Sequence, residues 1–518
     1  MKTETKILAL AVALLAVCGA VCACLFVITP LAGRLWGGNA STPSTGSPRP
    51  QSILPTYTVT RSFSATEDSS PLDPKLVGSV GIGDPYFPEM GNGGYDVQHY
   101  DLALKVDLDV EEISAVAKIE ARALQALGRF NLDLKDFNIE SLKVNGEDAA
   151  FTQAESELTI TPSAEIHQGS AFTVEVVYDG RPGEGEAFAG IDFLEGWNFY
   201  PGGVIVAGEP TGAETWFPSN NHPRDKATYA FRITVAKPYV AAANGVLKET
   251  TDNSDGTRTY RWVMDNPMAS YLSTIAISNF DLLEGKSESG VPFRNYLDAD
   301  IREDVESSVE ALPEALDFFG STFGPYPFDA CGLVVHELEI PFSLENQTLI
   351  VMGYNFVNET VVVHELAHQW FGDSVSISQW KDIWLNEGFA SYAETLWWEH
   401  TEGFSALKQD LSMRYNYIAS LPSSEVDPIG DPGPDHLFDP EVYYRGALTL
   451  HALRLEVGDS TFFRILQTYF LQFKHGNAAT SDFITLAEEI SNRELDGFFQ
   501  AWLYESTLPD IPELDLYS

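Results

Sequence analysis

The sequence has few cysteines outside its N-terminal end. Of its 4 cysteines, Cys18, Cys22 and Cys24 lie in an apolar run close to the N-terminus, and only Cys331 lies in the rest of the chain. This distribution excludes an internal disulfide in the globular part. Cys331 follows Pro327-Phe328 and precedes an apolar stretch, which is typical of a buried thiol rather than of a nucleophile.

Basic residues are also few. The chain has 31 lysines and arginines against 75 aspartates and glutamates, which gives a formal net charge of −44 at pH 7. Proteins bind nucleic acids through clustered cations, so we exclude a nucleic acid as a partner. The acidic residues are scattered along the chain, which is typical of a well-solvated surface and identifies no substrate.

Internal repeats and glycine-rich phosphate loops are absent from the sequence. The chain is nevertheless long, with 518 residues of which 44% are hydrophobic. This length exceeds the usual size of one domain, so we expect at least two folded domains with a large core.

One long uncharged run, Ile7–Ile28, stands at the N-terminus. As a helix it would extend about 33 Å, enough to cross the hydrocarbon core of a bilayer. Lys2 and Lys6 precede it, so the positive-inside tendency places everything downstream outside the cell membrane. Residues 1–32 are thus predicted to be a single-pass anchor. The alternatives are a cleaved signal peptide, which would give a secreted protein, and a lipid-modified Cys24.

The rest of the chain divides into three parts. Residues 33–93 are rich in Pro, Ser, Thr and Gly, which predicts a flexible stalk. Residues 94–289 alternate strand-like runs with turn signals and predict a mostly antiparallel β domain. Residues 290–518 have helical spacing and predict a mostly helical domain, which makes the fold class α+β.

The elements expected in these domains follow from the same patterns. The expected strands are Tyr100–Val110, Ala115–Ala123, Phe172–Tyr178, Thr228–Val235 and Thr257–Val263. The expected helices are Val305–Phe319, Thr360–Gly372, Glu387–His400, Gly446–Val457 and Ser481–Ser491.

The apolar helical stretch Val361–Trp370 contains the pattern His-Glu-x-x-His. Residues four apart return to the same helix face, so His364 and His368 can bind one zinc ion, while Glu365 is turned by about 100° toward a bound water. The pattern predicts Glu365 as the base that activates this water. Two ordinary core histidines are the alternative.

A catalytic zinc needs a third protein ligand and one open position. The candidate is Glu387, which stands in Trp384–Ala390 beyond a loop and at the start of a further predicted helix. By itself Glu387 would be read as a solvated acid at a helix start. Together with His364 and His368 it predicts a site for one zinc ion. A similar segment, His336–Ile340, has isoleucine where the second histidine is required, so we expect His336 at a strand end or in the core.

These motifs resemble those of the zinc aminopeptidase family typified by aminopeptidase N, a group of gluzincin metallopeptidases. The resemblance extends from about Tyr95 to the C-terminus, and it includes Leu385–Gly388, Trp216–Pro218 and Lys226–Thr228. It implies a saddle-like β-rich N-terminal domain followed by a thermolysin-like zinc domain. The chain ends soon after the segment that resembles the end of that domain, so it is similar to a short form without the C-terminal helical domain.

The resemblance also implies residues that bind the free amino group of a peptide. The family's Gly-x-Met-Glu-Asn segment is similar to Phe342–Asn346, which keeps Glu345 and Asn346 but has Phe342 and Leu344 in place of glycine and methionine. Glu209 is similar to the family's second amine anchor. A carboxylate at this place pairs with a substrate ammonium, so peptides with a free N-terminus are the implied substrates.

The family's Tyr-Glu-Lys-Gly segment is similar to Tyr443–Gly446. The resemblance implies that Tyr443 donates a hydrogen bond to the oxyanion of the tetrahedral intermediate, with Tyr444 as the alternative register. The implied reaction is aminopeptidase hydrolysis. A zinc endopeptidase would use the same zinc residues, and a non-catalytic peptide-binding surface protein is a further alternative. An additional epoxide hydrolase activity has no separate support in the sequence, and no oligomeric state is predicted.

Overall fold

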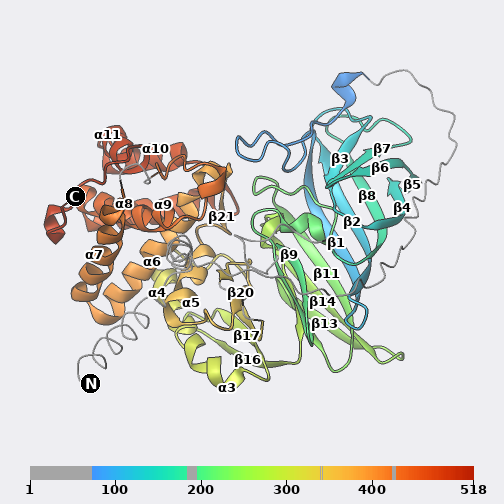
Figure 1. Ribbon diagram of the computed structural model, residues 1–518. Helices are drawn as coiled ribbons and strands as arrows, with labels where there is room; N and C mark the ends of the chain where they lie inside the picture. Colours follow the sequence, from blue (N-terminus) through green and yellow to red (C-terminus); the bar gives the residue numbers. More distant parts are fainter. Residues whose placement is uncertain (1–72, 184–194, 339, 341, 423–426, 518) are drawn as a thin grey trace, which may run out of the picture.

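A β-rich half and a mostly helical half lie side by side in the computed structural model of the protein (Figure 1). The structure describes residues 73–183, 195–338, 340, 342–422 and 427–517. The predicted anchor, residues 1–32, lies outside these ranges, as do residues 33–72 of the predicted stalk. Within the described ranges, no helix is both long and apolar enough to span a bilayer.

The β-rich half is built on an eight-stranded sheet with the order β13-β14-β11-β1-β2-β8-β4-β5. Its neighbouring strands are antiparallel except for the parallel pair β1 and β11. Two smaller sheets have the orders β3-β7-β6 and β12-β15-β10-β9. The bounds are β1 Tyr95–Asp107, β2 Glu112–Ala123, β3 Phe130–Asp133, β4 Asn138–Val144, β5 Glu147–Asp148, β6 Ala150–Ala154, β7 Glu157–Thr161, β8 Ala171–Gly180, β9 Gly196–Tyr200, β10 Gly203–Ala207, β11 Ala227–Ala236, β12 Val240–Ala243, β13 Val246–Asp252, β14 Thr257–Met268 and β15 Ile275–Ser278.

Alternating side chains explain why this sheet covers a core on one face. In β2, every second residue from Ile113 to Ala123 is buried and the residues between them are exposed. Successive side chains of a strand point to opposite faces, so this alternation gives one apolar face and one solvated face. The five strands expected from the sequence are all present.

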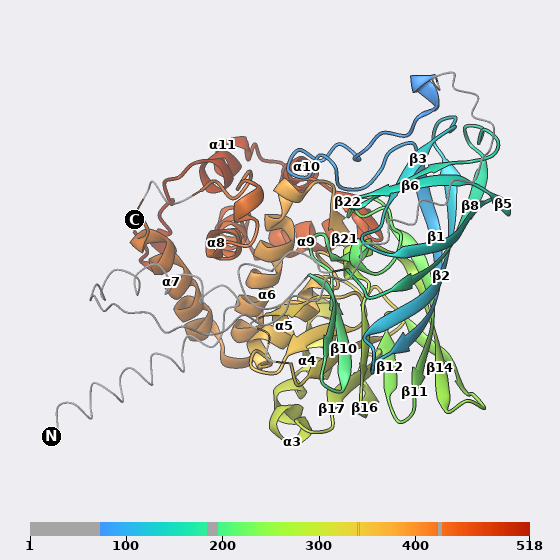
Figure 2. The same cartoon turned by 45° about the vertical axis from the view of Figure 1, so that its right-hand side comes forward.

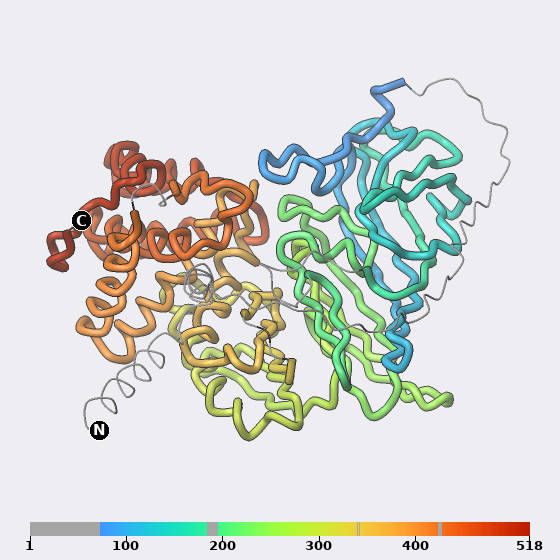
Figure 3. The backbone as a smooth tube through the Cα atoms, in the orientation of Figure 1, coloured from blue at the N-terminus to red at the C-terminus, as the bar shows by residue number. Residues whose placement is uncertain are grey.

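The helical half begins with a five-stranded sheet, β16-β17-β18-β20-β19, against which the first helices pack. Figure 3 follows the chain from this sheet, drawn in yellow, into the orange and red helices. The strands are β16 Phe280–Lys286, β17 Pro292–Asp298, β18 Cys331–His336, β19 Ser343–Leu344, β20 Ile350–Gly353, β21 Val375–Ile377 and β22 Gly476–Ala478. The helices are α3 Arg302–Val305, α4 Leu312–Thr322, α5 Glu359–His368, α6 Trp384–Glu402, α7 Phe404–Ser420, α8 Pro440–Val457, α9 Asp459–Phe473, α10 Thr480–Ser491 and α11 Asp496–Phe499.

Two features of this half differ from the sequence-based expectation. The predicted division between residues 289 and 290 falls inside the hairpin of β16 and β17. Both strands belong to the five-stranded sheet of the helical half. The single helix expected over Val305–Phe319 is interrupted, and α4 begins anew at Leu312 with Pro313 in its first turn. Proline lacks a backbone N–H and is tolerated in a first turn but not in a helix interior, so it marks the new start.

A segment of the predicted stalk is packed rather than flexible. Residues 77–93, the interdomain strap, leave the β-rich half and run toward α10 (Figure 2). The buried Asp84 carboxylate accepts hydrogen bonds from His222 Nε2 at 3.1 Å and from Trp380 N at 2.9 Å. The hydroxyl of Tyr86 accepts a hydrogen bond from Gly433 N at 2.8 Å. The local composition predicted a flexible stalk because it does not show contacts with residues that lie far away in the sequence.

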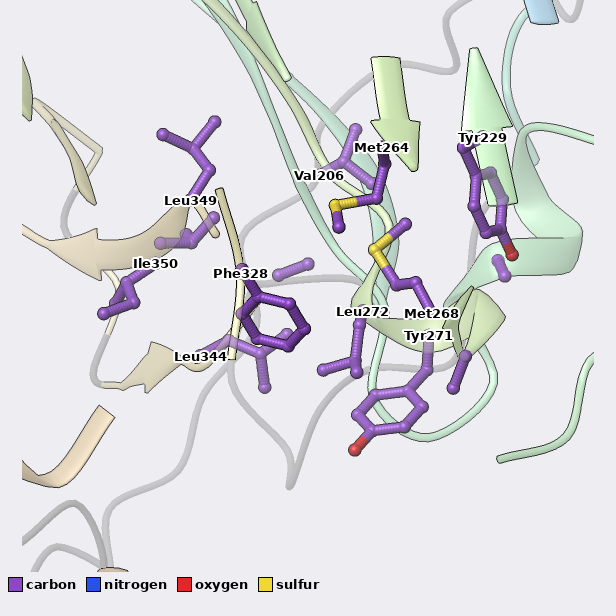
Figure 4. Close-up of a cluster of buried hydrophobic side chains, with 14 of the residues drawn as sticks. Val206, Tyr229, Met264, Met268, Tyr271, Leu272, Phe328, Leu344, Leu349 and Ile350 are labelled. Carbon is purple, nitrogen blue, oxygen red and sulfur yellow. The ribbon is translucent and has the colours of Figure 1, made fainter. Parts of the chain in front are cut away.

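Apolar and polar contacts join the two halves next to the segment that holds Glu345. Figure 4 shows side chains of β14 and of the turn at 270–272 in one cluster with Leu344 and Ile350 of the sheet in the helical half. The Nζ of Lys226, the residue before β11, donates to the carbonyl oxygens of Asp373 at 2.7 Å and Ser374 at 3.1 Å. Lys226 thus ties the β-rich half to the loop after α5.

Two glycines allow α6 and α8 to approach each other. A Cβ added to Gly446 would lie 2.5 Å from the Cα of Gly388, and no side chain can move aside to relieve this backbone contact. We expect Gly446→Ala to destabilise the fold by about 1–3 kcal/mol in chemical denaturation, because the helices must separate.

The control for this prediction is Gly320→Ala in α4, where an added Cβ would meet nothing within 4 Å. This variant should be neutral or more stable by about 0.5–1 kcal/mol, because alanine is the better helix former. Equal stabilities of the two variants would contradict the close approach of α6 and α8.

Candidate active site

Three predicted zinc ligands lie together where α5 meets the start of α6. The Nε2 atoms of His364 and His368 are 3.1 Å apart, and Glu387 Oε2 lies 3.3 Å from the first and 3.4 Å from the second. Ligand atoms around a tetrahedral zinc with bonds of 2.0–2.1 Å are separated by about 3.3 Å. These three side chains, the zinc triad, therefore fit a zinc ion.

The other ring nitrogens of the two histidines set the tautomers that zinc requires. His368 Nδ1 donates to the carbonyl oxygen of Phe371 at 3.1 Å, and His364 Nδ1 donates to the carboxylate of Glu394 at 2.6 Å. Neither acceptor can donate, so the protons lie on Nδ1 and both Nε2 lone pairs point toward the metal position.

The sequence motifs did not identify Glu394 as a partner of His364. It lies seven residues after Glu387 on α6, two helical turns away, so both carboxylates are on the face that points toward α5. That spacing is the signal that could have identified it as a partner of a ligand histidine.

Local sequence explains the position of α5. The side chain of Asn358 accepts a hydrogen bond from Val361 N at 3.2 Å and caps the helix. The valines that follow are fully buried, so they fix the rotation of α5 in the core. The exit from the helix is compact because Gly372 has a φ of 133°, which L side chains rarely adopt.

The charges of the triad favour a divalent cation. Burial would raise the pKa of Glu387, but the imidazoles of His368 and His364 outweigh it and lower this pKa to about 2. Burial would lower the pKa of His364, but its hydrogen bonds to Glu387 and Glu394 outweigh that effect and raise the pKa well above its ordinary value. A site that attracts protons so strongly also favours a metal ion in their place.

Glu365, the predicted base, lies on α5 between the two histidines and is 3% exposed. Burial raises the pKa of its carboxyl to about 8, although His364 and His368 oppose this shift. A general base needs a pKa near the working pH, so Glu365 is suited to exchange a proton with water at the triad.

The predicted amine anchors are buried close to the triad. Glu345 directly follows β19 and is 2% exposed, and the Tyr271 hydroxyl donates to its Oε1 at 3.4 Å. Burial raises the pKa of Glu209, and the carboxylates of Glu345, Glu387 and Glu365 raise it further. Glu209 Oε1 has no hydrogen-bond partner among the described residues. Two buried carboxylates that repel each other form an acceptor for a cationic group.

Asn346, predicted together with Glu345 as a substrate-binding residue, also contacts the β-rich half. Its side-chain Nδ2 donates to the carbonyl oxygen of Leu272 at 3.1 Å. Leu272 also belongs to the short helix η4, Ser270–Leu272, that carries Tyr271. Asn346 therefore ties the Glu345 segment to the β-rich half, whereas its Oδ1 has no hydrogen-bond partner within the described ranges.

The structure distinguishes the two adjacent tyrosines of α8. The Tyr443 ring stacks on His364, with ring centroids 5.9 Å apart and an angle of 24° between the planes. Tyr444 is 1% exposed and points into the core, where its ring packs edge-on against Tyr417. Tyr443 is thus the tyrosine that lies beside the triad.

His336 and Cys331 contribute no ligand atom to the triad. His336 is the fully buried last residue of β18, as expected, and burial lowers its pKa to about 3, so it stays neutral. Cys331 is buried at the start of the same strand, and burial raises the pKa of its thiol to about 11. The thiol is therefore not an activated nucleophile.

Comparisons with known proteins agree with this geometry. Residues 308–502 match the Peptidase family M1 domain, and residues 96–272 match the Peptidase M1 N-terminal domain. Mouse glutamyl aminopeptidase is 30% identical over 326 residues, which cover 58% of this chain and 34% of the mouse protein. The chain thus spans about a third of the length of this curated relative.

Solved structures are similar over nearly their full length. The M1 zinc metallopeptidase from Deinococcus radiodurans has a TM-score of 0.77 and 30% identity, covering 83% of this chain and 99% of that chain. A mutant of that enzyme bound to a Tyr-Ser-Ala substrate has a TM-score of 0.77 and 29% identity, covering 84% of this chain and 100% of that chain. A two-domain zinc peptidase is therefore similar to this chain in both halves.

Proposed function

Because the chain belongs to peptidase family M1, we propose that it is a zinc-dependent aminopeptidase that removes N-terminal residues from peptides. The family membership and the fit of the zinc triad to a tetrahedral ion support the use of zinc. In this proposal His364, His368 and Glu387 hold one zinc ion. When bound, zinc supplies Lewis-acid chemistry, because it lowers the pKa of water and polarises a carbonyl oxygen.

The remaining steps fall to side chains of the protein. Glu365 takes a proton from the attacking water and returns it to the leaving amine, for which its buried carboxyl is suited. The hydroxyl of Tyr443 donates to the oxygen on which negative charge develops, and this contact strengthens as the charge grows. The stacking of Tyr443 on His364 supports this role, because it holds the phenol beside the triad.

One observation carries the choice of an aminopeptidase. The buried carboxylates of Glu209 and Glu345 repel each other when both are ionised. The nearby carboxylates of Glu387 and Glu365 also repel an ionised Glu209. The ammonium group of a peptide with a free N-terminus relieves this repulsion and places the first peptide bond at the zinc triad. The Tyr-Ser-Ala substrate bound to the mutant Deinococcus radiodurans enzyme shows that a similar protein binds a short peptide.

We also propose that residues 1–32 anchor the protein in the cell membrane with the peptidase outside. The uncharged run Ile7–Ile28, preceded by Lys2 and Lys6, supports this location. Fractionation of cells that express the full chain tests it, because an anchored protein stays with membranes after a salt wash. Release into the medium would instead indicate the cleaved signal peptide.

The test of the aminopeptidase proposal compares one peptide with a free and with an acetylated N-terminus, using the zinc-loaded full chain. We expect cleavage of the free peptide alone. Glu345→Gln should lower kcat/KM for the free peptide by about 10- to 100-fold, because a hydrogen bond to a charged group contributes about 1.5–3 kcal/mol. Glu337→Gln is a control, since this partly exposed carboxylate is grouped with Asp298 and Asp300 and not with the zinc triad, so the rate should stay unchanged.

The other outcomes identify the alternatives. Equal cleavage of both peptides would contradict the role of Glu345 and favour a zinc endopeptidase. No cleavage by the zinc-loaded protein, together with peptide binding, would favour a non-catalytic binding protein.

A further inference from the structure

A chain of buried charged side chains leads from the zinc triad to α7. The carboxylate of Glu394 accepts from His364 Nδ1 through Oε1 at 2.6 Å, and from Arg414 Nη2 through Oε2 at 2.6 Å. Glu394 is 7% exposed and Arg414 is 1% exposed. The cation of Arg414 therefore lies two hydrogen bonds away from a zinc ligand.

The guanidinium of Arg414 uses its planar fork to bridge two helices. Its Nε donates to Asp410 Oδ2 at 2.9 Å, four residues earlier on α7, while its Nη2 donates to Glu394 on α6. Asp410 Oδ2 also accepts from Thr395 Oγ1 at 2.5 Å, on the residue after Glu394. This arrangement fixes how α7 lies on α6 at the point behind the triad.

Arg414 also contacts the start of α8. Its guanidinium carbon is 5.3 Å from the ring centroid of Tyr444, which is adjacent in sequence to Tyr443. Tyr443 in turn stacks on His364. One buried cation thus contacts both the carboxylate that orients His364 and the start of α8.

We propose that Arg414 is a positioning residue that sets the affinity of the site for zinc by holding the carboxylate of Glu394 against His364. The inference rests on the zinc site proposed above, and it adds a residue that no motif of the sequence indicated. The carboxylate of Glu394 must keep its orientation to accept from His364 Nδ1. Without the guanidinium, its Oε2 would lose the hydrogen bond that fixes this orientation from the side of α7.

The test measures zinc affinity of the metal-free full chain by competition with a chelator. Arg414→Met should weaken zinc binding by about 10- to 100-fold, the usual effect of losing an outer partner of a ligand. Arg414→Lys should give a smaller loss, because an ammonium keeps the charge but cannot bridge Glu394 and Asp410 as a planar fork does. If Arg414→Met does not fold, the zinc affinity of Arg414→Lys tests the proposal.

Arg454→Met is the matched control. Arg454 is a buried arginine that also bonds a carboxylate of α6, with Nη1 2.6 Å from Glu399 Oε2, and it pairs with Asp459 at 3.0 Å. Its partners are not partners of the zinc ligands, so this variant should lose stability and keep its zinc affinity. An equal loss of zinc affinity in the Arg414 and Arg454 variants would overturn the proposal, because it would indicate a general loosening of the fold.

A double-mutant cycle separates positioning from packing. If Arg414 acts through Glu394, the double variant Glu394→Gln/Arg414→Met should bind zinc no more weakly than Glu394→Gln alone. Additive losses, or unchanged zinc affinity in folded Arg414 variants, would overturn the inference. Failure of the proposed function has a different signature, namely a wild-type protein that binds zinc but cleaves no peptide.

Discussion

Glu365→Gln is expected to lower peptide cleavage severely while the protein still binds zinc. Glutamine keeps the size of the side chain and the three ligands, but it cannot take a proton from water. Loss of a general base lowers kcat by about 10²- to 10⁴-fold. Steady-state kinetics and metal analysis of the purified full chain measure both quantities.

The stability of Glu365→Gln provides the control. The pKa of Glu365 is raised to about 8 by burial, so in the metal-free protein ionisation of this carboxyl opposes folding at neutral pH. That penalty is present above the ordinary pKa of the carboxyl and is absent below it, where the group is protonated in both states. The metal-free variant should therefore melt at the same temperature as the wild type or higher at pH 7. A variant that keeps full activity would show that another group is the base.

Tyr443→Phe should lower kcat by about 10²- to 10³-fold and leave KM almost unchanged. The phenol contributes mainly when charge has developed on the carbonyl oxygen, so its loss removes transition-state stabilisation of about 2.7–4 kcal/mol rather than substrate binding. The ring itself is kept, and with it the stacking on His364. Measurement of kcat and KM separately distinguishes this result from a displaced substrate.

The adjacent residue supplies the comparison for this prediction. Tyr444→Phe removes the same hydroxyl one position later, where the ring is buried in the core and faces Arg414 and Tyr417. The rate should change by less than about threefold, because a phenylalanine keeps the packing. A larger loss of rate in Tyr444→Phe than in Tyr443→Phe would contradict the prediction, because it would indicate that Tyr444 makes the oxyanion contact.

Local patterns account for most of what the sequence predicted. The alternation in β2 and the four-residue spacing of His364 and His368 are properties of a single strand and a single helix, so they can be read without the fold. The choice between Tyr443 and Tyr444 could not be read in this way. It depends on how α8 is rotated against α5 and α6, and the Gly388–Gly446 contact helps to fix that rotation.

The features that the sequence did not predict depend on long-range partners. Glu394 and Arg414 are ordinary helix residues until α6 and α7 pack together and bury both charges behind His364. Asp84 and Tyr86 belong to a segment whose composition is typical of a flexible stalk. Hydrogen bonds from the backbones of Trp380 and Gly433 fix the positions of Asp84 and Tyr86. No local sequence pattern connects these residues.

The interdomain strap has a consequence for the order in which the molecule assembles. Its contacts with Trp380 and Gly433 close loops of 296 and 347 residues, so they cannot form until most of the chain has left the ribosome. All strands of the β-rich half pair within residues 95–278, so this half can fold before the helical half has been made. The strap is thus made before both halves, but its contacts with Trp380 and Gly433 form only after much of the helical half has been made.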